Sequence, residues 1–387
     1  MVDDGREEKL LEKLEKMIHS GNASTAKYVA EELRRLYNSE IKDMEGGQQT
    51  PEEAEKRADV VRRMAKVHWI LNEQALAMKY YSDAIYVSPR SRSAAMSYNG
   101  IGEIHRLQAR WAEATEAYTK AKKISDDIKF KEGSAEALRG LGYIHWRIGE
   151  LVDAKTAYAL ALSILGKDDR SMTAGRLRTE IANLHNEMDE LDEAEASYLE
   201  AQRIANENGD KHELARINNN LGFLYGKRGE WTRAKKEFEK EIKIGEMLND
   251  QRWVGWGLMN LSEAESRSGN GSRGKELIAR ALNTLKEVDD PIGMAKAVFL
   301  EGYAYEAMGQ RDKAFKSFMN GVHAVAQEGM VPVAAYFTLE YSLALERLGE
   351  RNKALRQAEK ARDMYKKLGI PNYVEECEDA IRRFEKT

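Results

Sequence analysis

The sequence is poor in residues that break helices or cross-link chains. Among 387 residues there are 5 prolines and one cysteine, Cys377. Because proline interrupts helices, its scarcity favours a nearly all-helical fold. A single cysteine excludes an intramolecular disulfide framework. Cys377 lies on the apolar face of the last expected helix, so we interpret it as a small core residue rather than a nucleophile.

The chain also lacks long apolar runs and a large net charge. No apolar stretch approaches the roughly 20 residues that a membrane span needs, and the acidic start MVDDGREE has no apolar segment of a signal peptide. The formal net charge is -4, with 33% charged residues of both signs, whereas nucleic-acid binders carry a basic stripe. We therefore expect a soluble, cytoplasmic protein that binds no nucleic acid and inserts in no membrane.

A small residue recurs every 40 positions and sets the frame of the chain. In one copy this small residue is Gly222, which follows the large apolar residue Leu221. A turn residue, Gly229, and an aromatic residue, Phe238, come after it. The frame residues are Gly102, Gly142, Ala182, Gly222, Ser262, Gly302 and Ser342. Such regular recurrence predicts a repeat protein that grows by stacking, instead of two or three globular domains.

This frame resembles the tetratricopeptide repeat (TPR) family, whose repeats pair a first helix (helix A) with a second (helix B). The 40-residue period is similar to that of kinesin light chains and Leu-Gly-Asn-repeat adaptors, a likeness carried by Asn208-Gly209-Asp210 and Asn220-Leu221-Gly222. The resemblance implies an all-α, right-handed superhelical solenoid of antiparallel helix pairs, with about eight to nine repeats. It also implies a binding architecture, but the family has many partners.

Domain boundaries are predicted where the frame degenerates. The expected parts are an N-terminal helical hairpin (1–45, a degenerate repeat or cap), a linker (46–50), a first TPR-like repeat (51–88), seven regular 40-residue repeats (89–368) and a C-terminal capping helix (369–387). Terminal repeats are often atypical because one face must meet water. Thr50 and Glu53 predict a capping box at the start of the first TPR-like repeat.

Four histidines share one frame position, three residues after the small residue: His68, His105, His145 and His185. The same position holds Tyr225 and Tyr305 in later repeats, which indicates a structural slot for a flat ring. Even adjacent packed helices lie about 8–10 Å apart, whereas each zinc ligand lies about 2.1 Å from its metal. We therefore expect no metal site from these histidines.

No catalytic motif is recognisable in the sequence. It has no nucleophile elbow, no phosphate-binding loop after a strand and no His-Glu-x-x-His. The glycine-rich stretch 269–274 falls at the turn between helices A and B, and we interpret it as a loosened turn. We expect no catalytic residues, no cofactor and no enzymatic activity.

The family pattern places groove-facing side chains on helix A, close to each small residue. The resulting candidates for peptide contact are Arg139, Tyr143, Arg176, Asn183, Asn186, Arg216, Asn219, Asn220, Phe223, Trp256, Asn260 and Tyr303. Asparagine amides can hold an extended backbone, arginines suit carboxylates, and aromatic residues anchor ligands. In the alternative interpretation, the arginines and asparagines form a solvated face with internal salt bridges and the aromatics pack between helices.

These residues support one leading hypothesis and two alternatives. The leading hypothesis is a non-enzymatic protein–protein interaction adaptor that binds an extended, partly acidic peptide or disordered segment of another protein between Arg139 and Tyr303. The chain also resembles, in length and helical front end, the Rap-type regulators that sense a small signal peptide, although residues 1–60 look more like a degenerate repeat than an effector bundle. The third hypothesis is a structural subunit of a larger assembly, in which self-association is possible.

Overall fold

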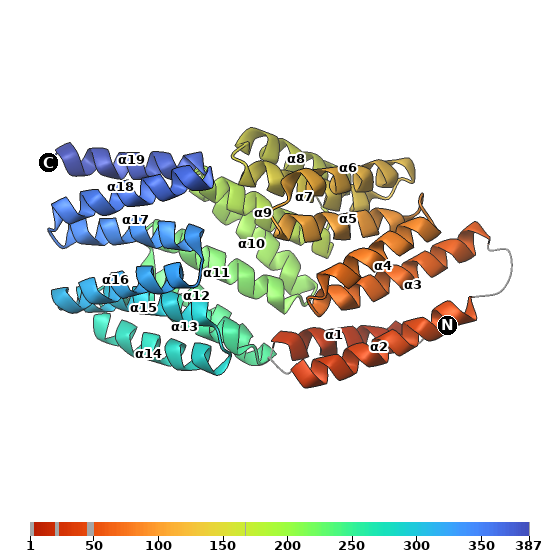
Figure 1. Ribbon diagram of the computed structural model, residues 1–387, viewed down its shortest axis with the longest axis horizontal. Coiled ribbons are helices and arrows are strands. Elements are labelled where there is room, and N and C mark those ends of the chain that lie inside the picture. Colours follow the sequence, from red (N-terminus) through yellow and green to blue (C-terminus); the bar gives the residue numbers. More distant parts are fainter. Residues whose placement is uncertain (1–3, 20–22, 45–49, 167, 387) are drawn as a thin grey trace. The chain divides into compact units, whose positions relative to one another are not determined.

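The computed structural model describes residues 4–19, 23–44, 50–166 and 168–386 (Figure 1). The regular secondary structure of these ranges is helical, which confirms the all-α prediction. The helices are α1 (Asp4–His19), α2 (Ala23–Asp43), α3 (Pro51–Ile70), α4 (Gln74–Val87), α5 (Arg92–Leu107), α6 (Trp111–Asp127), α7 (Lys131–Arg147), α8 (Leu151–Leu165), α9 (Met172–Glu187), α10 (Leu191–Glu207), α11 (Lys211–Lys227), α12 (Trp231–Leu248), α13 (Gln251–Arg267), α14 (Gly271–Glu287), α15 (Pro291–Ala307), α16 (Arg311–Gln327), α17 (Val331–Arg347), α18 (Arg351–Leu368) and α19 (Pro371–Lys386).

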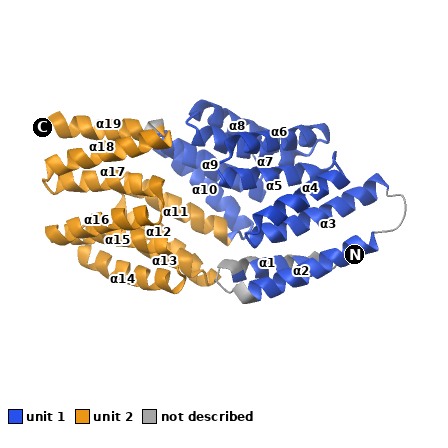
Figure 2. Ribbon diagram, viewed as in Figure 1, with its two compact units in different colours: residues 1–210 blue, residues 211–387 orange. Residues whose placement is uncertain are grey.

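Consecutive helices pack as antiparallel pairs, as predicted for a solenoid. In the regular repeats, helix A is α5, α7, α9, α11, α13, α15 or α17, and helix B is the helix that follows. Contacts divide the chain into two compact units, residues 1–210 and 211–387 (Figure 2). Unit 1 ends after α10, and unit 2 begins with α11.

In the repeats whose frame residue is glycine, the frame of the sequence corresponds to a contact inside the repeat. A Cβ atom on Gly222 would lie 2.3 Å from the ring of Phe238, and one on Gly142 would lie 2.5 Å from Tyr158. The small residue of helix A therefore makes room for the aromatic residue of helix B. Because the contact is internal to one repeat, every copy of the repeat preserves the same spacing.

The turns between helices A and B use left-handed backbone conformations. Gly229 has φ 74° and Asp189 has φ 61°, at the turn positions that the sequence frame predicts. In the first regular repeat the same position holds Ala109, with φ 55°. The left-handed region is costly for residues with a Cβ atom, so Ala109 is a local source of strain.

A capping box begins α3 near the N-terminal end of the chain, and apolar packing holds the last helix, α19, at the C-terminal end. Of the predicted linker, 46–49 lie outside the described residues, but the capping box is confirmed: Glu53 N donates to Thr50 Oγ1 at 3.2 Å, and Thr50 N donates to Glu53 Oε2 at 2.8 Å. At the other end, Cys377 is buried among the apolar residues of α18 and α19. Burial raises the pKa of its thiol to about 12.

The N-terminal hairpin is held to α3 by buried polar contacts. Tyr37 Oη donates a hydrogen bond of 2.7 Å to Glu7, and Arg63 of α3 pairs with Glu7 and, at 3.3 Å, with Glu40. Tyr37 and Glu7 are both buried. No helix among the described residues has the length and apolarity to cross a membrane.

Candidate functional site

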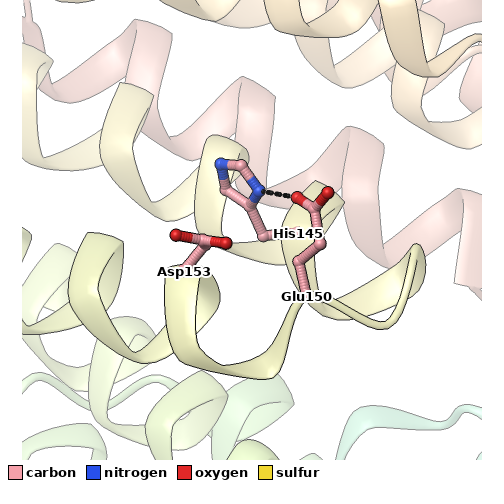
Figure 3. Close-up of side chains that lie close together, drawn as sticks. All are labelled: His145, Glu150 and Asp153. Atoms are coloured by element: carbon pink, nitrogen blue, oxygen red, sulfur yellow. Dashed lines mark hydrogen bonds and ion pairs between the residues drawn. The ribbon is translucent and has the colours of Figure 1, made fainter.

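At three of its four histidines, the histidine slot pairs the ring with a carboxylate across the turn from helix A to helix B. The Nδ1 atom of His145 lies 2.6 Å from Glu150 (Figure 3). That of His68 lies 2.6 Å from Glu73. His185 pairs with Glu190 in the same way. Asp153 brings a third possible metal-ligating atom within 4.8 Å of the other two in the His145 cluster. This cluster is largely exposed, and its histidine already engages Glu150, so the slot joins the two helices of a repeat.

His105 is the exception in this series, because Arg110 replaces the carboxylate five residues later. Its Nδ1 atom has no hydrogen-bond partner among the described residues. Burial, and then the positive charge of Arg110, lower the pKa of His105. A carboxylate five residues later thus accompanies the ring at His68, His145 and His185, and His105 is without one.

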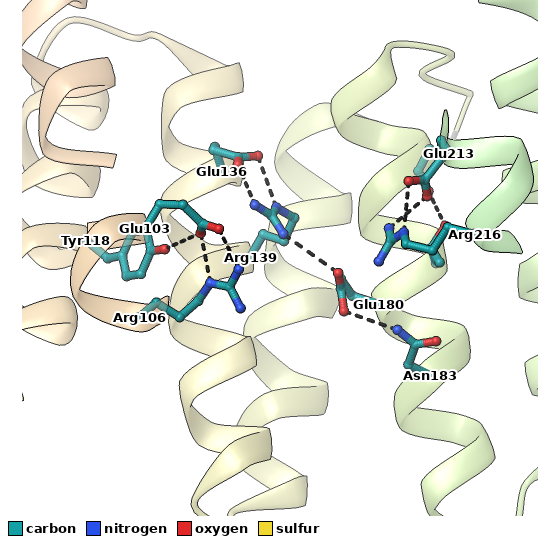
Figure 4. Close-up of polar contacts among 11 residues, drawn as sticks. Glu103, Arg106, Tyr118, Glu136, Arg139, Glu180, Asn183, Glu213 and Arg216 are labelled. Atoms are coloured by element: carbon teal, nitrogen blue, oxygen red, sulfur yellow. Dashed lines mark hydrogen bonds and ion pairs between the residues drawn. The ribbon is translucent and has the colours of Figure 1, made fainter. Parts of the chain in front are cut away.

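In unit 1 the polar face of helix A is a ladder of internal pairs (Figure 4). Arg139 donates to both carboxylate oxygens of Glu136, at 3.1 and 2.6 Å, and its Nη1 lies 3.8 Å from Glu180. Glu180 in turn accepts a 3.3 Å hydrogen bond from Asn183, whose Oδ1 accepts one of 2.7 Å from Tyr198. These two predicted peptide contacts therefore already serve the internal salt bridges of the alternative interpretation.

The other predicted polar contacts differ in how much water they meet. Arg176 is 50% exposed and lies 3.5 Å from Asp210, so it is the more accessible arginine of unit 1's predicted set. Arg216 donates to both oxygens of Glu213, at 3.0 and 2.8 Å. Tyr143 packs its ring under the guanidinium of Arg106, at 4.2 Å. Asn186 and Asn220 are half-buried on α9 and α11.

Unit 2 contains two hollows formed mainly by residues of successive A helices. The first has a volume of about 260 Å³ and is lined by Gly222, Phe223, Gly226, Lys227, Trp231, Phe238, Asn260, Glu263, Ala264, Arg267, Tyr336 and Glu340. The second has a volume of about 360 Å³ and is lined by Trp231, Ser266, Arg267, Gly269, Tyr303, Glu306, Ala307 and Arg347. Because Trp231 and Arg267 line both hollows, the two adjoin each other and together form the candidate site.

The charged groups of this site are paired with one another. Arg267 donates to Glu263 at 2.7 Å and to Glu340 at 3.2 Å, and Tyr303 Oη donates to Glu340 at 2.6 Å. Arg347 pairs with Glu306 at 2.8 Å. The Arg267 guanidinium also stacks over the Tyr303 ring at 4.1 Å. The walls are thus aromatic, and the charges near them are already compensated.

A buried carboxyl group lies behind the first hollow. Glu241 of α12 is fully buried, and Asn219 donates to its two oxygens at 3.1 and 3.2 Å. Burial raises the pKa of Glu241 to about 8, while the amides of Asn219 and Asn260 act in the opposite direction. Asn260 is 7% exposed, and its amide group acts on Glu241 from the side of the hollow that Asn260 lines. Asn260 therefore stands between the hollow and Glu241.

The structure gathers only some of the predicted site residues at the hollows. Phe223, Asn260 and Tyr303 line them. Asn219 is engaged by Glu241, and Trp256 donates from Nε1 to Asp290 at 3.0 Å. The sequence set omitted Trp231 and Glu241 because both belong to helix B, whereas the family pattern assigns the groove to helix A. An aromatic residue at the first position of a helix was the available signal for Trp231.

Paired helices with a repeated small-to-aromatic contact define this chain as a helical repeat protein. The model of the tetratricopeptide repeat family matches residues 93–167 and 173–247, so these residues form tetratricopeptide repeats. No curated protein sequence matches it significantly.

Several solved structures share the fold. A Rap protein complexed with competence and sporulation factor has 16% identity and a TM-score of 0.63, and the match covers 94% of this chain and 98% of that one. The apo quorum sensor NprR from B. thuringiensis has 14% identity and a TM-score of 0.62, covering 93% and 97%. Aspartyl phosphate phosphatase F from Bacillus subtilis has 11% identity and a TM-score of 0.61, covering 96% of each chain. At these identities the likeness concerns the fold alone.

Proposed function

We propose that this protein is a non-enzymatic adaptor that binds an extended peptide segment of a partner protein on the A helices of unit 2. The observation that carries the proposal is the pair of adjoining hollows around Trp231 and Arg267. Aromatic anchors in concave sites provide much of the energy of protein recognition. Tyr336 is 46% exposed at the rim of the first hollow, so its ring is available to a ligand.

We assign the preference for partly acidic peptides to Arg216 of unit 2, whose side chain is 34% exposed. A peptide carboxylate would compete with Glu213 for Arg216. Arg176 of unit 1 is a separate candidate for carboxylate contact, with a side chain that is 50% exposed, whereas that of Arg139 is 16% exposed. Coupled ordering of the peptide limits the affinity, and we expect dissociation constants of roughly micromolar order.

A selection experiment tests this function directly. A displayed library of random octapeptides would be selected on the immobilised full chain, and enriched peptides would be titrated by fluorescence anisotropy. We expect Tyr336→Ala to weaken binding at least about tenfold, which corresponds to about 1.4 kcal/mol. Met319→Ala is the matched control, because Met319 is a similarly exposed apolar residue on α16. A library without enriched peptides, or equal effects of the two variants, would overturn the proposal.

A second candidate function is a peptide-sensing regulator. The observation in its favour is that the matches to the Rap and NprR structures cover more than nine-tenths of this chain and of each of theirs. A selected peptide would then compact the whole protein, and small-angle scattering would record a smaller radius of gyration. An unchanged radius at saturating peptide would leave the adaptor as the better description.

A further inference from the structure

Gly226 leaves room for the ring of Trp231 beside the first hollow. It is the penultimate residue of α11, and a Cβ atom there would lie 3.3 Å from the ring of Trp231, with no other residue within 4 Å. Gly222, by contrast, would place a Cβ atom 2.3 Å from Phe238 and must stay small. A side chain at Gly226 would thus displace Trp231, which is a wall of the first hollow, rather than a residue of the core.

The same position is larger in every other regular repeat: Arg106, Trp146, Asn186, Ser266, Glu306 and Glu346. Only the repeat of Gly222 leaves it without a side chain, and this is where the first hollow opens. Gly226 lines that hollow together with Trp231 and Phe223. The missing side chain is thus the feature that distinguishes this repeat at the hollow.

The chemistry of the walls specifies the occupant. Arg267 forms ion pairs with both Glu263 and Glu340. Because these three side chains compensate one another, Arg267 does not require an anionic ligand. Phe223, Trp231 and Tyr336 supply aromatic surface. A volume of about 260 Å³ is below the 300–1,000 Å³ of sites that hold whole small-molecule ligands. It suits one large side chain.

We infer that the hollow over Gly226 is a subsite for one large, uncharged apolar or aromatic side chain of a bound peptide. This inference rests on the proposed peptide-binding function and names its side-chain specificity. It explains why the helix tolerates glycine at this position: any other residue would occupy the space that the ligand needs.

The first test uses single-residue probes on the full chain labelled with nitrogen-15. N-acetyl-phenylalaninamide and N-acetyl-lysinamide would be titrated to millimolar concentration, with the indole N–H of Trp231 as the NMR reporter. We expect saturable shifts with the phenylalanine probe and at least tenfold weaker binding of the lysine probe. Equal binding of both probes, or no shift at Trp231, would overturn the inference.

The second test separates ligand binding from folding. Gly226→Ala should weaken binding of the phenylalanine probe, because its methyl group would displace the Trp231 ring that lines the hollow, and thermal unfolding of the variant records whether the fold is kept. Gly226→Leu should weaken binding of the phenylalanine probe at least tenfold. A lower melting temperature with unchanged probe binding in Gly226→Ala would show a purely structural glycine and overturn the inference. If the phenylalanine probe binds but no octapeptide is enriched, the subsite stands and the adaptor function fails. If octapeptides are enriched but share no apolar side chain, the adaptor function stands and the subsite fails.

Discussion

The side-chain amide of Asn219 donates to both carboxylate oxygens of Glu241, at 3.1 and 3.2 Å. The two residues lie on the adjacent helices α11 and α12 of one repeat, and Glu241 is fully buried. The groups that act on its pKa are the amides of Asn219 and Asn260, neither of which carries charge. A carboxyl group placed in this way is more stable protonated than ionised.

Glu241 should make the stability of the protein fall as the pH rises. Its pKa is raised to about 8 in the folded state from an ordinary value of 4.5, so the folded state binds more protons between these values. The free energy of unfolding therefore decreases through this window, by up to about 1.4 kcal/mol per pH unit. Urea unfolding at pH 6 and pH 8 should show a clear loss in the wild type and a smaller one in Glu241→Gln. The exposed Glu239→Gln is the control; a wild-type pH dependence retained by Glu241→Gln would refute the assignment.

Replacing Ala109 by glycine should stabilise the first regular repeat. Ala109 adopts φ 55°, and relief of the left-handed strain exceeds the added freedom of glycine in the unfolded chain. We expect a gain of about 0.5–1 kcal/mol in urea unfolding. Gly149→Ala is the matched reverse change, since Gly149 occupies the equivalent turn with φ 88° and an added Cβ atom there would meet no other residue within 4 Å. A stabilising effect of Gly149→Ala would contradict the explanation.

Arg110→Glu should complete the histidine pairing that is missing at His105. The new carboxylate would stand where Glu150 and Glu190 stand in the next repeats, within reach of the ring. We expect the pKa of His105 to rise above its wild-type value, and a net gain of about 0.5–1.5 kcal/mol from the hydrogen bond. An NMR titration of the ring protons measures the pKa. Arg110→Gln removes the positive charge without adding a carboxylate; the same pKa in both variants would show that no pair forms.

Arg139 and Arg176 should respond differently to loss of charge. Arg139→Met leaves Glu136 and the buried Glu180 without their shared cation, so we expect a loss of at least about 2 kcal/mol in the free energy of unfolding. Arg176→Met, at a 50% exposed side chain, should stay within about 0.5 kcal/mol of the wild type. Equal effects would place the two arginines in the same role. For this reason Arg176, and not Arg139, suits tests of peptide recognition.

Much of the fold followed from the sequence because its signals are local. The contact of Gly222 with Phe238 and the turn at Gly229 are internal to one repeat, so they recur at the same spacing in the chain. The capping box joins Thr50 and Glu53, which are three positions apart in the chain. Periodicity and turn chemistry were enough to specify paired helices, and they also assigned the histidine slot a structural role.

The candidate site depended on contacts that no period records. Arg139 was predicted to meet a ligand, but Glu180, which it approaches, belongs to the next repeat. Arg267 reaches Glu340 across 73 residues, and Trp231 enters the hollow from helix B. The sequence by itself determined the helices, their pairing and their turns, because neighbouring residues fix these. The tertiary structure alone decided which side chains compensate one another and where a hollow stays open, because that depends on the packing of helices from different repeats.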